Sequence, residues 1–232
     1  MGQQRKTVHL LLAMVLAALT MGAVSVVAKG DIIVGFRSST YTLEGYNYKV
    51  DVPRFDIDGV DGAYLQARDV FNRSVRRAAD IYIARAGDHV DVKTGTNYVY
   101  TNQQVLSTKF SVSIYNEGAA HPYEDFITHN TRTETGKALV LRDLFTNVDS
   151  GLSVLQQQAA ILVPKATDGE PYYKDALLPK EDNYRHWAVA KDGLRVYFGE
   201  IASHAAGNIM ITVPWQALDK VLKPDMKAAL TA

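Results

Sequence analysis

The chain has 232 residues, enough for one good-sized domain or two small ones, and its 47% hydrophobic and 22% charged residues are ordinary for a globular protein. Lys plus Arg and Asp plus Glu number 25 each, so the net charge gives no electrostatic reason to expect nucleic acid or anionic lipid as a partner. No cysteine is present, which excludes a disulfide framework, a thiolate metal site and a cysteine-linked lipid anchor.

The N-terminus has the pattern of an export signal. Arg5 and Lys6 precede an uncharged apolar run over residues 8–28 that ends in small residues, so residues 1–28 are predicted to be a signal peptide. The run is close to the ~20 residues of a spanning helix, so an uncleaved membrane anchor is the alternative, and residues 8–28 would be the sole membrane contact. We therefore expect an extracytoplasmic protein that is secreted, periplasmic or anchored at the cell envelope.

Two elements are expected next along the chain. Residues 41–52 alternate polar with aromatic and β-branched side chains and predict one strand with a bulge at Gly45. A long helix should follow, with Asp58 or Asp61 as N-cap and Gly87 as its stop. Its apolar residues recur at three- and four-residue steps: Tyr64, Ala67, Phe71, Val75, Ala78 and Tyr82.

The middle of the chain predicts two strands, a turn and a second helix. Residues 97–107 and 109–118 have strand patterns, and a turn is expected at residues 134–137. Residues 138–145 should form a strand that runs into a helix ended by Pro164. In the second strand Phe110, Val112 and Ile114 should point inward and Ser111, Ser113 and Tyr115 outward, and the helix should bury Leu152, Leu155, Ala159 and Leu162.

The last third predicts a loop over residues 165–183, a hairpin, a strand and a short helix. The hairpin should turn at residues 191–193, where Gly193 would supply a positive φ. This order indicates an α+β fold, with antiparallel sheets and helices packed on one face, divided into residues 29–90 and 91–232 after the leader. One common core is expected to hold Leu139, Leu141, Leu144, Phe145, Trp187, Val189, Val196 and Phe198.

The sequence contains no recognisable catalytic or cofactor motif. A nucleophile elbow, a phosphate-binding glycine loop and a paired-histidine zinc motif are all missing, so we predict no catalytic residues, no metal site and no cofactor. His121 and His129 would lie roughly 26 Å apart on a continuous strand and could not share an ion. A metal-binding protein that uses these two residues and His204 is therefore the weakest alternative.

Residues 118–123 and 203–208 are small and polar segments that interrupt apolar strands. They are the candidate contact loops, because loops held on a rigid scaffold often carry function. His121 precedes a proline, which should place it in an extended, non-helical corner. Its ring could then reach a neighbouring backbone carbonyl or the other loop. The candidate binding residues are Gly118, Ala120, His121, Pro122, Tyr123, His204 and Asn208.

Two quoted segments resemble a known family. "YNEGAAHPYEDFITHNTRTETGKALVLRDLF", residues 115–145, and "YFGEIASHAAGNIMITVPWQAL", residues 197–218, are similar to the two signatures of the extracytoplasmic domain of RsiV-type anti-sigma factors, domain of unknown function family 3298. A secreted mycobacterial immunogenic protein carries a related pattern. "YTLEGYNYKVDVPRF" and the long helix resemble the usual N-terminal companion half, so the resemblance begins near residue 40.

The resemblance implies a binding module, because the ectodomain of that family binds lysozyme. Only about seven residues precede the apolar run, so we expect the binding fold without the anti-sigma signalling role. The hypothesis is a non-catalytic envelope module whose partner is a lysozyme-type muramidase or a cell-wall glycan. The rival is an envelope hydrolase with dispersed Asp, Glu and His, in which His121 and Glu124 would be the acid and base.

Overall fold

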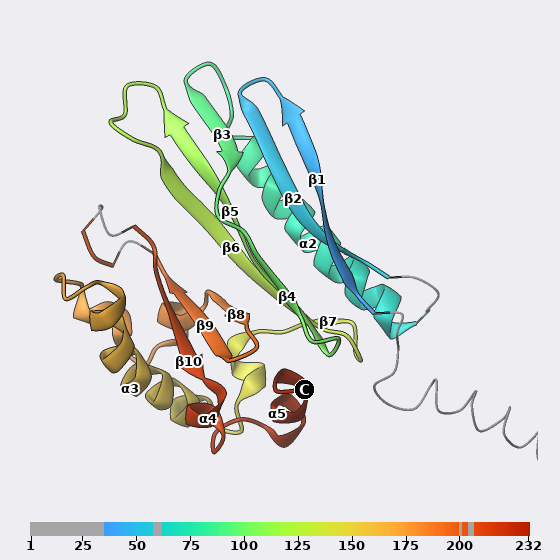
Figure 1. Ribbon diagram of the computed structural model, residues 1–232, viewed down its shortest axis with the longest axis vertical. Coiled ribbons are helices and arrows are strands. Elements are labelled where there is room, and N and C mark those ends of the chain that lie inside the picture. Colours follow the sequence, from blue (N-terminus) through green and yellow to red (C-terminus); the bar gives the residue numbers. More distant parts are fainter. Residues whose placement is uncertain (1–34, 58–61, 200, 204–206) are drawn as a thin grey trace, which may run out of the picture. The chain divides into compact units, whose positions relative to one another are not determined.

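The computed structural model describes residues 35–57, 62–199, 201–203 and 207–232. The predicted leader lies outside these residues. No helix in the described part of the chain combines the length and the apolarity that crossing a bilayer requires. The predicted α+β class is confirmed, and the strands form two sheets (Figure 1).

The larger sheet has seven strands. Neighbouring strands run antiparallel, except for a short parallel pairing between β2 and β3. β4 pairs with the part of β5 that β3 does not reach. The sheet includes strands from both sides of residue 90, where a domain boundary was predicted. In sheet order the strands are β1 (Arg37–Gly45), β2 (Tyr48–Asp56), β3 (Val90–Thr94), β5 (Val105–Asn116), β6 (Tyr123–Arg132) and β7 (Lys137–Ala138), with β4 (Tyr98–Thr101) beside β5.

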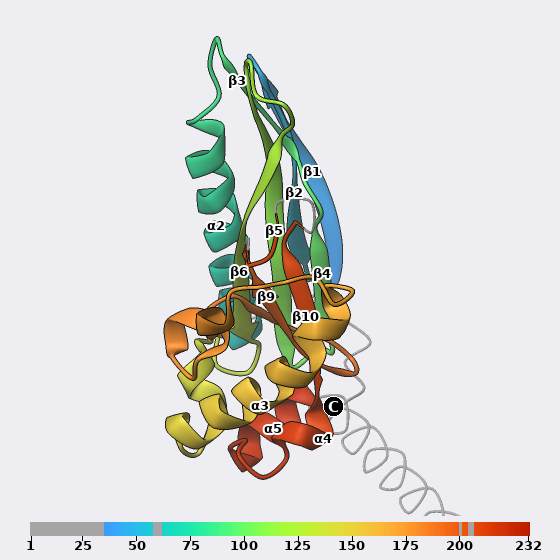
Figure 2. The same ribbon diagram turned by 90° about the vertical axis from the view of Figure 1, so that its left-hand side faces the viewer.

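One face of the larger sheet is covered by helix α2 (Ala63–Ile83), which confirms the predicted helix (Figure 2). Its apolar stripe packs against β2, β5 and β6 because residues three and four apart share one side of a helix. Gly62 stands at the N-cap position; the predicted caps Asp58 and Asp61 lie outside the described residues. The residues of α2 buried in this core are Ala67, Phe71, Val75, Ala78, Ala79 and Tyr82.

The smaller sheet has three antiparallel strands in the order β10, β9, β8, and helix α3 packs against it. The predicted common core is confirmed here, with Leu139 partly buried at its edge. The elements are the 3-10 helix η1 (Leu141–Leu144), α3 (Val148–Ala166), the 3-10 helices η2 (Lys174–Leu177) and η3 (Glu181–Tyr184), β8 (Trp187–Val189), β9 (Gly193–Phe198), β10 (Ile209–Pro214), α4 (Trp215–Leu218) and α5 (Pro224–Leu230).

Polar side chains of the larger sheet hold the free edge of β8. The Asn130 amide donates to the carbonyl of Trp187 at 2.9 Å, and the amide N–H of Trp187 donates to the Thr128 hydroxyl at 3.1 Å. The N–H of Val189 donates to Ser107 Oγ at 2.8 Å, and the Tyr98 hydroxyl donates to its carbonyl at 3.0 Å. Because an unpaired strand edge is costly to bury, these four bonds explain how the two sheets dock.

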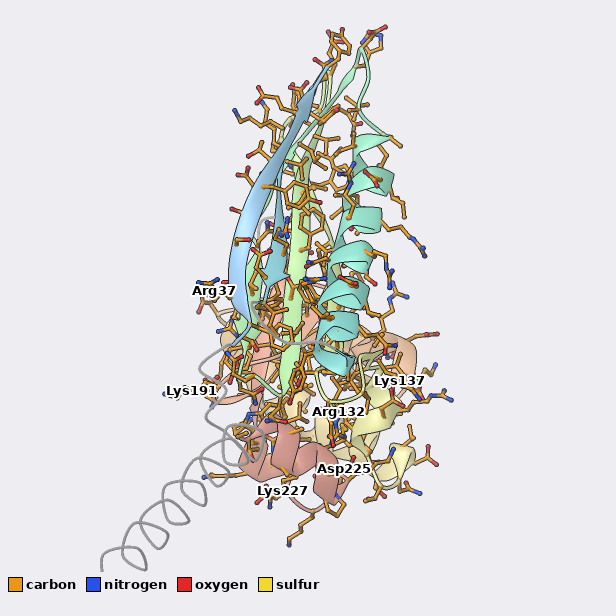
Figure 3. All side chains as sticks on the ribbon, turned by 90° about the vertical axis from the view of Figure 1, so that its right-hand side faces the viewer. Arg37, Arg132, Lys137, Lys191, Asp225 and Lys227 are labelled. Atoms are coloured by element: carbon orange, nitrogen blue, oxygen red, sulfur yellow. The ribbon has the colours of Figure 1, made fainter. Side chains whose placement is uncertain are left out.

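An ion pair links the end of β6 to the C-terminal helix α5. Arg132 of β6 donates to Asp225 of α5 at 2.7 Å and to Glu134 at 2.9 Å (Figure 3). Burial would lower the pKa of Arg132, but the hydrogen bonds to both carboxylates raise it. The pair therefore joins the larger sheet to the C-terminal helix.

Two predictions of local structure are wrong because of turns. Residues 41–52 form a hairpin rather than one strand, since Gly45 pairs with Tyr48 across a two-residue turn. Asn47 has a φ of 56°, a left-handed conformation that asparagine tolerates better than most residues. Gly193 does not have the predicted positive φ. A side chain there would instead meet the carbonyl oxygen of Val213 at 2.2 Å, so close packing of β9 against β10 requires the glycine.

Two further predictions are wrong because of packing. Residues 138–145 do not form a strand: β7 ends at Ala138, and a 3-10 helix follows so that Leu141 and Leu144 can reach the core. Ser111 was expected to face outward, yet its exposed fraction is 0%. Its hydroxyl donates to the carbonyl of Thr96 at 2.8 Å, because the segment before β4 covers this face of β5.

Candidate functional site

The main candidate site is a pocket between the two sheets. Along β5 and β6, every second side chain faces α2, and the side chains between them face the smaller sheet. In the same way, every second side chain of the smaller sheet faces β5 and β6. Where the docked edge of β8 ends, the facing side chains enclose about 730 Å³. The wall consists of Thr96, Asn97, Tyr98, Lys109, His121, Pro122, Tyr123, Glu124, Arg195, Tyr197, Gly207, Asn208 and Met210.

The structure brings most of the predicted contact residues together at this pocket. His121, Pro122 and Tyr123 from one loop and Asn208 from the other line the same wall, although 84 positions separate Glu124 from Asn208. The Asn208 amide lies 3.5 Å from the carbonyl oxygen of Glu124, which places the two segments in contact. Two loops chosen for their composition alone therefore meet at one site.

The remaining predicted residues lie elsewhere. Ala120 lines a neighbouring depression that shares His121, Tyr123 and Asn208 with the main pocket. Gly118 is at the loop tip with a φ of +82° and lines neither hollow. His204 lies outside the described residues.

His121 occupies the non-helical corner that its position before Pro122 predicts. Its side chain is exposed, and ring atom Nδ1 lies 3.1 Å from the carbonyl oxygen of Pro122. The predicted reach to a backbone carbonyl is confirmed. This contact orients the ring at the rim where the two hollows meet.

A buried ion pair forms the floor of the pocket. Lys109 of β5 is 6% exposed and donates to the carboxylate of Glu124 on β6, to the carbonyl of Thr96 at 2.7 Å and to Ser111 Oγ at 3.1 Å. Burial would raise the pKa of Glu124, but the hydrogen bond and the charge of Lys109, with a hydrogen bond from the Thr96 hydroxyl, outweigh it and lower the pKa below its usual value. Glu124 is therefore an ionised carboxylate whose charge is already matched.

Aromatic and cationic side chains form the opposite wall. The guanidinium carbon of Arg195 on β9 lies 4.0 Å from the ring centre of Tyr98 on β4, a cation–π contact. Burial raises the pKa of Tyr98 to about 12, even though the Arg195 charge acts the other way. Tyr197 lies two residues further along β9 on the same face and is buried. We did not predict this wall from sequence, because alternate polar residues on a hairpin are typical of a solvent-facing side.

His129, the histidine of β6, does not line the pocket. His129 projects from β6 toward α2, where its ring packs edge-on against Phe71 and accepts or donates a 3.0 Å hydrogen bond with Thr131. Burial lowers its pKa to about 4, so the ring is neutral at pH 7. The uninterrupted strand keeps His129 apart from His121, so the two cannot share a metal ion as the weakest alternative required. Within the described residues, no three His, Asp or Glu side chains converge as a metal site would need.

Fold and pocket together define an α+β domain of two docked sheets with a concave site between them. Residues 142–216 match the model of DUF3298, described as a protein of unknown function. The predicted resemblance to this domain family is confirmed over that segment, which contains the smaller sheet and α3. It includes Arg195, Tyr197 and Asn208 of the pocket, whereas the His121 loop precedes it.

Solved structures extend the likeness of fold beyond that segment. A DUF3298 family member from Bacteroides fragilis aligns with a TM-score of 0.60 at 14% identity, over 86% of this chain and 99% of its own. A DUF3298 family protein from Pseudomonas aeruginosa aligns with a TM-score of 0.52 at 13% identity, over 82% of this chain and 94% of its own. No curated protein sequence matches the chain. The larger sheet is thus shared in fold with these proteins, and the RsiV-type likeness stays a prediction.

Proposed function

We propose that this protein is a non-catalytic binding module of the cell envelope whose ligand inserts a short segment into the pocket between the sheets. The observation that carries the proposal is the meeting of the two predicted contact loops at one pocket with aromatic walls. Its volume of about 730 Å³ is within the range of sites that hold small ligands or peptide segments. The apolar run over residues 8–28 supports the envelope location.

Binding suits this site better than catalysis. A general acid at neutral pH needs a raised pKa, whereas the pKa of Glu124 is lowered and its carboxylate is held by Lys109. A general base must accept a proton, and the ion pair with Lys109 opposes protonation of Glu124. The pair His121 and Glu124, the acid and base of the rival hydrolase hypothesis, therefore lacks the electrostatics of a catalytic pair.

The resemblance to RsiV-type ectodomains suggests the partner class: a lysozyme-type muramidase, with a cell-wall component as the alternative. Both could present a short segment to a pocket of this size. We propose no signalling role, because the resemblance concerns the binding fold alone.

The test is a binding measurement on the secreted domain with lysozymes and with solubilised cell-wall fragments. Met210 lines the pocket and is 39% exposed, so Met210→Trp should fill the pocket and abolish binding. The control is Ile161→Trp, a similar increase in size at an exposed position of α3 that does not line the pocket; it should bind like the wild type. Undiminished binding by Met210→Trp would place the ligand elsewhere. Turnover of cell-wall substrate that Glu124→Gln removes would favour the hydrolase.

A further inference from the structure

Arg195 is a half-buried cation whose charge no carboxylate matches among the described residues. Its Nε atom is buried and has no hydrogen-bond partner, although the guanidinium lies over Tyr98. Other arginines differ: Arg85 pairs with Asp125 and Arg142 with Glu181. A cation removed from water is costly unless a counter-charge accompanies it, and a ring face supplies only part of that compensation.

Tyr197 presents a second unmatched polar group on the same face of β9. Its side chain is 7% exposed, and its hydroxyl donates no hydrogen bond to any described residue. Burial raises the pKa of this hydroxyl, and the neighbouring Arg195 offsets part of the rise through a side-chain hydrogen bond to the oxygen and through its charge. The group therefore stays protonated and can donate a hydrogen bond. Leaving such a donor unused in a buried place lowers stability.

Among the described residues that line the pocket, the positive and negative charges do not cancel. Lys109 and Glu124 neutralise each other on the floor, so Arg195 leaves a net positive charge on the wall. The complement of a positive charge beside a hydroxyl donor is an anion. A planar carboxylate fits a guanidinium best, because its two oxygens accept parallel hydrogen bonds from two nitrogens.

We infer that the pocket binds a ligand through a carboxylate, which pairs with Arg195 and accepts a hydrogen bond from Tyr197. This inference rests on the proposed function, since it names the anchoring group of the ligand at the same site. Because Arg195 Nε and the Tyr197 hydroxyl are both buried, binding requires these two side chains to move toward the carboxylate. The carboxylate can belong to a cell-wall glycopeptide or to an acidic side chain of a protein, and the chemistry is the same.

Matched pairs of probes test the inference by titration calorimetry. The first pair is muramyl dipeptide with a free carboxylate and its amide; the second is a capped aspartate tripeptide and its asparagine analogue. For at least one pair, the acid should bind the wild-type protein at least about tenfold more tightly than the amide. The pair that shows this preference identifies the source of the carboxylate. Binding should also shift the side-chain N–H resonance of Arg195.

Variants separate the anchoring role from a structural one. Arg195→Gln should bind the acid and the amide equally. Tyr197→Phe should lose affinity for the acid severalfold while melting no lower than the wild type, because it removes a buried hydroxyl that donates no hydrogen bond. The control is Arg142→Gln, because Arg142 pairs with Glu181 outside the pocket. This variant should still bind the acid more tightly than the amide.

The possible failures are distinguishable. Equal binding of acid and amide by the wild type, or a preference that persists in Arg195→Gln, overturns the carboxylate inference and leaves the binding function standing. If neither member of either pair binds, and lysozymes and cell-wall fragments do not bind either, the proposed function is overturned together with the inference.

Discussion

Strands β5 and β6 have two faces that serve different purposes. One face is apolar, with Phe110 and Ile114 packed under α2 in a continuous core. The other is polar, with Ser107 and Asn130 bonded to the edge of β8 and with Lys109 at the pocket. The apolar face therefore stabilises the larger sheet, while the polar face positions a second sheet and leaves a site where the contact ends.

The apolar face should be the more sensitive to truncation. Phe110 is 0% exposed, so Phe110→Ala should lower the free energy of unfolding by about 3 to 5 kcal/mol through lost burial and a residual cavity. Denaturant unfolding followed by circular dichroism measures the change. If Phe110→Ala lowered the free energy of unfolding by less than every variant on the polar face, the proposed ranking of the two faces would be reversed.

Breaking the buried ion pair should have the next largest effect. Lys109→Met leaves Glu124 ionised and half-buried without its cation, which should cost about 2 to 4 kcal/mol at pH 7. In the wild type the lowered pKa of Glu124 means that its stabilisation is present above the unfolded pKa of about 4.3 and is lost as the pH falls through the folded pKa.

The pH dependence of the Lys109→Met variant supplies its control. Without the cation, burial raises the pKa of Glu124. As the pH falls, protonation therefore removes the unpaired buried charge and lessens the destabilisation of the variant. The difference in unfolding free energy between variant and wild type should therefore shrink between about pH 7 and pH 4. A difference that is constant across this range would mean that Lys109 acts through packing and not through its charge.

The joint between the sheets should respond more moderately. Asn130→Ala removes the 2.9 Å bond to Trp187 and the 2.6 Å bond from Ser107, and should cost about 2 kcal/mol because buried groups lose their partners. Ser107→Ala and the double variant complete a thermodynamic cycle. Because the two side chains share one network, their effects should not add, and strict additivity would contradict a shared joint.

The loop at the pocket rim should be the least sensitive of these regions. Gly118→Val forces a β-branched residue into a φ of +82° and should cost a little over about 1 kcal/mol through backbone strain alone, since no atom lies near the added side chain. His121→Asn should change stability by less than about 0.5 kcal/mol and leave binding intact. A stable His121→Asn protein that has lost binding would make this histidine a direct ligand contact.

The spacing of apolar residues predicted which side of a helix or strand is buried in an apolar core. The α2 stripe and the apolar side of the β8–β9 hairpin are buried as predicted. The other side of the hairpin is also buried, against the larger sheet, which the alternating pattern did not predict. The two-residue turn at Tyr46 and Asn47 was missed because neither residue is a glycine or a proline, so the strand pattern continues through it.

The polar face could not be predicted in the same way. Ser107, Ser111 and Asn130 have the composition of a solvent-facing side, and a sequence does not show that a second sheet lies above them. The same limit hid Arg195 and Tyr197, whose neighbours come from β4 and β6, far away in the chain. The loops of the site were found because small and polar residues interrupt apolar strands there.

The most direct test is a chemical-shift map of the protein, titrated with the acid probe or the partner that binds it. We predict that the largest changes cluster at the pocket, with Arg195, Tyr197 and Asn208 among them, while exposed residues at the far end of the larger sheet, such as Tyr46, stay unchanged. Changes that cluster around Tyr46 and leave the pocket unaffected would contradict the claim that the space between the sheets is the binding site.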